Sequence, residues 1–83
     1  MKVNVKYFAS IREALGQSSE TCDTQAKTVA ALRDELLALS PVHAQALSRH
    51  KPVRMALDQT MCDELATLHE GCELAFFPPV TGG

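Results

Sequence analysis

A single long amphipathic helical segment lies among short extended segments, and this arrangement limits the folds open to the chain. The apolar positions that recur at helical spacing are Val29, Leu32, Leu36 and Leu39. Thr28, just before them, is a good N-cap residue, and we expect the helix to run from there to about Leu39. Ser40-Pro41 then ends it, because a proline disfavours helical geometry in the residue before it. Residues 33–35, Arg-Asp-Glu, are expected on the solvent side.

Strand-like segments flank this helix on both sides. In residues 2–8, Val3, Val5 and Tyr7 point one way, whereas Lys2, Asn4, Lys6 and Phe8 point the other, which is typical of a half-buried strand. We expect further strands at 17–23, 53–57 and 73–77, and a short strand or irregular stretch within 61–68. Short helical turns are expected at 8–15, closed by Gly16, and at 42–47, while turns are expected at 58–60 and 70–71.

Four or five strands and one main helix cannot form a doubly wound sheet. A helix on one face of a small mixed sheet is the economical α+β solution, and a helix between strands permits the favoured right-handed crossover. In the β-grasp arrangement of this kind, the first and last strands lie side by side and parallel at the sheet centre. We predict a β-grasp domain over residues 1–77 and an extended tail over residues 78–83.

Composition excludes several classes of function. With 83 residues, 46% of them hydrophobic, and a net charge of −2, the chain suits one small globular domain and not a nucleic-acid-binding protein. No apolar run approaches the roughly 20 residues of a membrane span, and residues 2–6 are too polar for a signal-peptide core. The three cysteines, Cys22, Cys62 and Cys72, are an odd number without a C-x-x-C pair. We therefore expect reduced thiols, a cytosolic location and no metal site.

The final residues, Pro78-Pro79-Val80-Thr81-Gly82-Gly83, carry the most information about function. Glycine lacks a Cβ, so a Gly-Gly end can thread a slot that other residues would block. The two prolines favour extended backbone and should make the tail project from the domain. The alternative is an ordinary frayed terminus. We favour a presented tail, because the apolar strand 74–77 runs directly into it.

The parity of the last strand predicts an apolar patch beside this tail. If Leu74 and Phe76 face the helix, then Phe77 lies on the open face of the sheet, and so does Phe8 by the same argument. Met61, at a turn, could extend the patch. Adjacent exposed aromatic residues indicate an interface, whereas a loop that covers them would make them part of the core. We favour the interface, because small sheets rarely cover both faces.

Several segments resemble a known family. Residues 76–83, Phe-Phe-Pro-Pro-Val-Thr-Gly-Gly, are similar to the C-terminal signature of the small subunit of molybdopterin synthase. The resemblance covers the whole chain, through Tyr7-Phe8-Ala9 with Ile11-Arg12-Glu13 and Gly16, Thr28 to Leu32, Ala56 to Thr60, and Gly71 to Leu74. Two residues depart from the family pattern, since Asp58 stands where asparagine is usual and Cys72 where aspartate is frequent.

The resemblance implies a ubiquitin-like sulfur carrier. A separate activating enzyme would use ATP to adenylate the Gly83 carboxylate, and a sulfur-donor protein would convert the adenylate to a thiocarboxylate. Gly82 would be needed for passage and Gly83 for the chemistry. The tail, residues 78–83, would insert into the large synthase subunit and supply sulfur for making molybdopterin from a cyclic pterin phosphate. Two small subunits would bind a dimer of large subunits.

The same resemblance implies that the chain binds no cofactor and has no independent active site. Two other functions use the same fold and stay open. One is a sulfur carrier for another pathway, such as thiazole or amino-acid synthesis. The other is a protein modifier joined to lysines through Gly83. The Phe-Phe-Pro-Pro-Val-Thr run favours the molybdopterin pathway.

Overall fold

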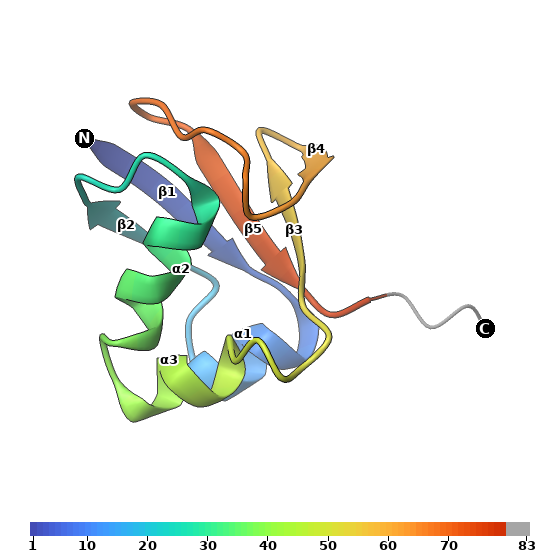
Figure 1. Ribbon diagram of the computed structural model, residues 1–83. Helices are drawn as coiled ribbons and strands as arrows, with labels where there is room; N and C mark the ends of the chain where they lie inside the picture. Colours follow the sequence, from blue (N-terminus) through green and yellow to red (C-terminus); the bar gives the residue numbers. More distant parts are fainter. Residues whose placement is uncertain (80–83) are drawn as a thin grey trace.

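The computed structural model describes residues 1–79 and contains one mixed sheet with helices packed against one of its faces (Figure 1). In chain order the elements are β1 (Lys2–Tyr7), α1 (Ala9–Leu15), β2 (Ser19–Asp23), α2 (Val29–Leu37), α3 (Pro41–Ala46), β3 (Arg54–Leu57), β4 (Thr60–Cys62) and β5 (Glu73–Phe77). β1, β2, β3 and β5 lie within two residues of the predicted segments. β4 begins at Thr60, which belongs to the predicted turn 58–60, and covers only the start of the predicted stretch 61–68. β1 ends one residue early, because Phe8 becomes the N-cap of α1.

The sheet has the order β2-β1-β5-β3-β4. β1 and β5 are parallel at its centre, with Val5 opposite Leu74 and Tyr7 opposite Phe76. Antiparallel pairing joins β1 to β2, β3 to β5, and β3 to β4. The predicted central parallel pair of first and last strands is therefore confirmed, and the sheet has five strands within residues 1–79.

The core lies between the sheet and the helices. Val3, Val5 and Tyr7 of β1 are buried, and the residues between them are exposed, as the alternation predicts. Leu74 and Phe76 of β5 are fully buried in the same cluster as Leu32 and Leu36 of α2. This confirms that the even-numbered side chains of β5 face the helix and leaves Phe77 on the open face.

Helix α2 begins where the sequence predicts and ends earlier. The Thr28 side chain accepts a hydrogen bond from the backbone N–H of Ala31 at 3.2 Å, which is the expected N-cap. The helix ends at Leu37, and the prediction that Leu39 belongs to its buried face is wrong, since Leu39 is 58% exposed. The backbone N–H of Leu39 bonds to Leu36 at 3.0 Å, a tightened last turn that leads the chain out toward α3.

Arg33 is also placed differently from the prediction. It is buried, with 4% of its surface exposed, and does not face solvent. Its Nε and Nη2 donate to the carbonyl oxygen of Leu47 at 2.9 and 2.8 Å, and Nη2 also donates to that of Ser48 at 3.2 Å. Those carbonyls follow the end of α3 and have no partner within that helix. Arg33 therefore joins α2 to the end of α3.

A buried polar cluster that the sequence did not reveal connects α3 to the first two strands. Glu20 Oε2 accepts from the Tyr7 hydroxyl at 2.6 Å and lies 2.8 Å from His43 Nε2. Ser40 Oγ lies 2.7 Å from His43 Nδ1, and the Tyr7 ring stacks on Phe76 with centroids 6.3 Å apart. Burial alone raises the pKa of Glu20, but the hydrogen bonds from Tyr7 and His43 outweigh it and hold that pKa below its usual value.

We predict that Leu74→Ala lowers the free energy of unfolding by about 2 to 5 kcal/mol, because it leaves a cavity beneath the central strand pair. Leu65→Ala is the matched control, since Leu65 is 83% exposed and the same truncation there should change the free energy by less than about 0.5 kcal/mol. Urea unfolding followed by circular dichroism measures both. Equal losses in the two variants would contradict the core described above.

Candidate functional site at the end of the central strand

The described chain leaves the sheet at the end of β5. Figure 1 shows β5 in the middle of the sheet, with the chain leaving the sheet at the C-terminal end of this strand. Pro78 and Pro79 follow Phe77 there and are half-buried. The remaining tail residues predicted to act in sulfur transfer, Val80, Thr81, Gly82 and Gly83, lie outside the described residues. The functional role predicted for residues 78–83 therefore stays a prediction.

An apolar hollow of about 640 Å³, which we call the open-face groove, lies beside this exit on the face of the sheet opposite the helices. Its lining residues are Phe8, Ala9, Ala56, Gln59, Glu73, Ala75, Phe77, Pro78 and Pro79. Ala56 and Ala75 lie opposite each other on β3 and β5 and point to the same face. Their small side chains form a low floor, and the larger side chains around them provide the walls.

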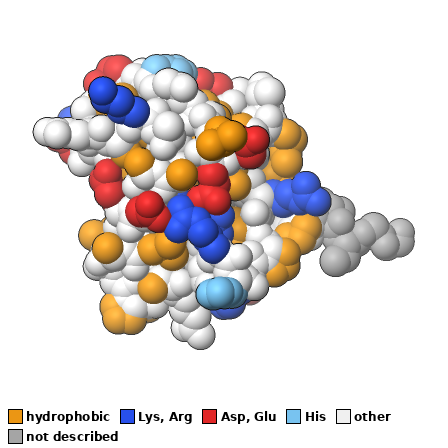
Figure 2. All heavy atoms as spheres, in the orientation of Figure 1, with side chains coloured by type: hydrophobic (Ala, Val, Ile, Leu, Met, Phe, Trp, Pro, Cys, Tyr) orange, Lys and Arg blue, Asp and Glu red, His pale blue; other side chains and the backbone are white. Residues whose placement is uncertain are grey.

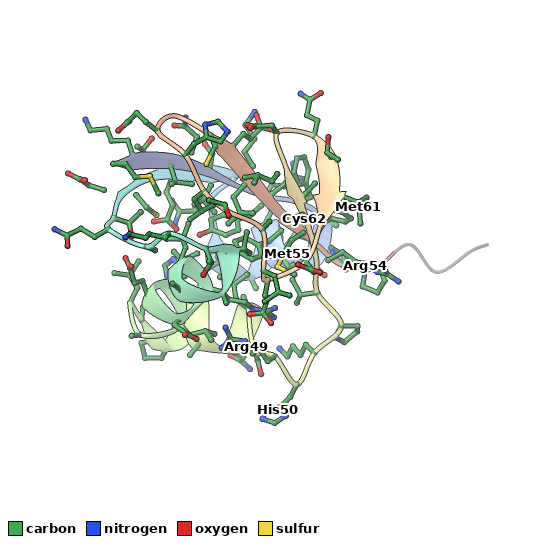
Figure 3. All side chains as sticks on the ribbon, turned by 45° about the horizontal axis from the view of Figure 1, so that its top comes forward. Arg49, His50, Arg54, Met55, Met61 and Cys62 are labelled. Carbon is green, nitrogen blue, oxygen red and sulfur yellow. The ribbon has the colours of Figure 1, made fainter. Side chains whose placement is uncertain are left out.

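The structure brings Phe8 and Phe77 together in this groove. Phe8 is held extended, with φ −129° and ψ 155°, and its backbone N–H donates to the carbonyl of Phe76 at 3.2 Å. Its side chain is 45% exposed, so no loop of the described chain covers it. Met61 of β4 lies opposite Ala56 on the same face and is 58% exposed, but it does not line the groove (Figure 3). The predicted partner-binding role of these three residues remains a prediction.

A polar turn closes the groove at the end away from the exit. Asp58 and Gln59 have positive φ angles of 49° and 68°, as a tight β3–β4 turn requires. Asp58 Oδ1 accepts the backbone N–H of Glu73 at 2.9 Å, and Oδ2 accepts from His69 Nε2 at 2.7 Å. The departure from asparagine at this position therefore adds a charge-assisted contact. At the other departure, Cys72 is buried and belongs to the core.

The Asp58–His69 pair shifts both titrations. The backbone hydrogen bond from Glu73, followed by that from His69, lowers the pKa of Asp58. The hydrogen bond to Asp58, followed by that to the Glu70 carbonyl, raises the pKa of His69. Because the His69 pKa is raised, the stabilisation it supplies is present below about pH 6.5 and is lost as the pH rises through the folded-state value. Because the Asp58 pKa is lowered, the stabilisation that Asp58 supplies is present above about pH 3.9 and is lost as the pH falls through the folded-state value.

Arg49, the first residue of the basic loop 49–52, is neutralised by its surroundings. Arg49 forms ion pairs with Asp34 and Glu64, each at 2.6 Å. In Figure 2 a basic cluster near the middle of the visible face is flanked by acidic side chains, as this pairing requires.

The cysteines, the possible metal ligands and the helices of the described residues bear on disulfide, metal-binding and membrane-spanning functions. Cys22, Cys62 and Cys72 are free thiols, with Cys72 buried and the others half-buried, as predicted. Among residues 1–79, no three His, Cys, Asp or Glu side chains gather closely enough to hold a metal ion. Within that same range, no helix combines the length and hydrophobicity that a membrane crossing requires.

The topology, one main helix against a mixed sheet with parallel first and last strands, defines a ubiquitin-like β-grasp protein. SAMP1, a small archaeal modifier protein from Haloferax volcanii, has the same fold, with a TM-score of 0.78 and 25% identity over 100% of both chains. A chain in a complex of subunits 1 and 2 of the molybdopterin-converting factor from Helicobacter pylori shares the fold with a TM-score of 0.73 and 24% identity, over 100% of both chains.

Sequence comparison gives the family. Residues 5–83 match the ThiS family, and the chain belongs to that family. It is 40% identical over 81 residues to the molybdopterin synthase sulfur carrier subunit of Escherichia coli, which covers 98% of this chain and 99% of the relative. The suspected family resemblance is therefore confirmed along the whole chain, and the fold prediction with it.

We predict that Asp58→Asn lowers the pKa of His69 toward the ordinary value of about 6.5, because the amide cannot stabilise the imidazolium as the carboxylate does. Titration of the His69 ring protons by NMR measures this. Asp63→Asn, a matched change at an exposed residue without contact to His69, should leave the titration unchanged. An unaltered His69 titration in Asp58→Asn would show that the pair does not form in solution.

Proposed function

We propose that this protein is a sulfur carrier that acts as a C-terminal thiocarboxylate on Gly83 and donates sulfur for converting a cyclic pyranopterin monophosphate to molybdopterin. The observation that supports this most strongly is the full-length similarity to a relative named as the sulfur carrier subunit of molybdopterin synthase. The similarity includes the end of the chain, since the family match extends to residue 83. The exit of a central strand beside an apolar groove is consistent with a tail handed to other proteins.

The proposed chemistry is balanced and needs no active site in this chain. The Gly83 carboxylate attacks the α-phosphate of ATP in the activating enzyme, forming an acyl adenylate and releasing pyrophosphate. A persulfide on the donor protein then displaces AMP and forms an acyl disulfide. A second thiol attacks the donor's sulfur in this disulfide, which releases the thiocarboxylate and leaves the donor as a disulfide. A thiocarboxylate is ionised at neutral pH and is a good nucleophile toward the pterin substrate. The partner enzymes supply acid, base and positioning, while the carrier supplies reach.

The proposed partners follow from the same assignment. The large subunit of molybdopterin synthase would bind the exit face, in a heterotetramer of two small and two large subunits. The Helicobacter pylori chain of the same fold, which is in a complex of subunits 1 and 2 of the molybdopterin-converting factor, supports a partner of this kind. Phe8, Phe77 and Met61 would form the apolar part of the contact, because exposed aromatic and methionine side chains are enriched at interfaces. Three free thiols fit the cytosol as the proposed location.

A protein modifier is the second candidate function. The observation that favours it is the similarity to SAMP1, at 25% identity, which is lower than the identity to the sulfur carrier subunit. A sulfur carrier for another pathway is the third. Adducts of this chain on lysines of other proteins would indicate the modifier, whereas co-purification with a large synthase subunit would indicate the molybdopterin pathway.

We predict a gain of about 16 Da, the difference between sulfur and oxygen, in the intact mass after incubation with the activating enzyme, ATP and a sulfur source. A variant with one alanine added after Gly83 is the matched control and should show no gain, because its terminal carboxylate is displaced from the reacting position. Thiocarboxylate formation on the extended chain would refute the assignment of Gly83.

We predict that Phe77→Asp weakens binding to the large synthase subunit by about 100-fold, because it places a charge in the apolar wall of the open-face groove. Leu65→Asp introduces the same charge at an exposed residue that does not line the groove and should bind as the unmodified chain does. Titration calorimetry measures both. Equal affinities for the two variants would show that the open-face groove is not part of the interface.

A further inference from the structure

Pro78 and Pro79 lie between two hollows and not beside one. The open-face groove is on one side of them. A second hollow of about 360 Å³, which we call the helix-side groove, has the same two prolines in its wall. Its apolar lining includes Ile11 and Ala14 of α1, Ala46 of α3, and Val53 just before β3. The strand exit is therefore a ridge with an apolar groove along each flank.

The helix-side groove also contains a cation without an opposite charge. Lys51 lines it and is exposed, and within residues 1–79 no acidic side chain forms an ion pair with it. Two other cations of the domain are neutralised, since Arg49 pairs with two carboxylates and Lys6 with Glu73. On the other flank, Arg54 lies opposite Phe77 and is likewise exposed, with no ion pair in the described part of the chain (Figure 3). Lys51 on one flank and Arg54 on the other are thus positive charges without an ion pair in residues 1–79.

We infer that the helix-side groove is a second docking site for the protein that receives the tail, and that its occupant is a segment of that protein with an apolar side chain next to a carboxylate. This inference rests on the proposed function, and its partner is the large synthase subunit. The apolar side chain would enter between α1 and Val53, and the carboxylate would pair with Lys51 at the rim.

Two observations favour a protein segment as the occupant. The groove is continuous with the proposed interface, because Pro78 and Pro79 belong to both hollows. Its floor is aliphatic, since Ile11 and Ala46 are buried, and beside Lys51 the Ser10 hydroxyl is the one lining side chain that could donate a hydrogen bond to a free phosphate. A partner that contacts both flanks would fix the direction in which the chain leaves the ridge. Contact on one flank alone would not fix this direction.

The test measures binding of the full-length chain to the large synthase subunit of the same organism by titration calorimetry at low and at high ionic strength. We expect Lys51→Glu to weaken binding by about tenfold at low ionic strength, with a smaller difference at high ionic strength, because salt screens a rim charge. We expect Ala14→Phe, which fills the groove, to weaken binding by about tenfold or more at both.

Each variant has a matched control at an exposed residue outside both grooves. Lys27→Glu makes the same charge change, and Ala44→Phe makes the same size change on α3. Both controls should bind as the unmodified chain does. Thermal unfolding of all four variants, with midpoints close to that of the unmodified chain, shows that each remains folded.

The outcomes separate this inference from the proposed function. If Lys51→Glu and Ala14→Phe bind normally while Phe77→Asp does not, the helix-side groove is not a docking site and the proposed function stands. If the unmodified chain does not bind the large subunit, both are wrong. If the chain is a dimer by light scattering and Ala14→Phe makes it monomeric, the occupant is a second copy and the inference is overturned.

Discussion

The parallel pairing of β1 with β5 is the contact on which the rest of the structure depends. It joins the two ends of the described chain, and β2 and β3 each pair with one of its members. Its ladder includes the backbone bond from Phe8 to Phe76, which positions the aromatic side chain of Phe8 beside Phe77. Parallel pairs need a long crossover, and the helices supply it while covering one face of the sheet. The same pairing therefore produces the core, the strand exit and the open-face groove.

One face of β5 packs in the core and the other faces the groove, because successive side chains of a strand point in opposite directions. Leu74 and Phe76 stabilise the domain, whereas Ala75 and Phe77 line a surface. As a central strand, β5 is paired with β1 on one side and with β3 on the other. The five residues of β5 therefore contribute both to the core and to the open-face groove.

The buried cluster of Ser40, His43 and Glu20 has the residue types and short contacts of a hydrolytic triad. Its surroundings give it a structural role. Ser40 is the N-cap of α3 and accepts the backbone N–H of His43, while Glu20 also accepts the Tyr7 hydroxyl. These bonds satisfy polar groups that burial would otherwise leave unpaired. The described residues proposed to take part in function lie instead at the strand exit.

The sequence by itself determined the strands, the start of the main helix, the parity of the last strand and the family. Each of these depends on local chemistry, namely alternation, capping, proline geometry and the Phe-Phe-Pro-Pro signature. Only the tertiary structure decided that Arg33 is buried, because its carbonyl partners follow α3, whose position no local pattern encodes, and that Leu39 is exposed, because α2 ends at Leu37. It also decided that Lys51 and Ala14 share a groove with Pro78 and Pro79, since those residues are distant in the chain and meet only when β5 pairs with β1.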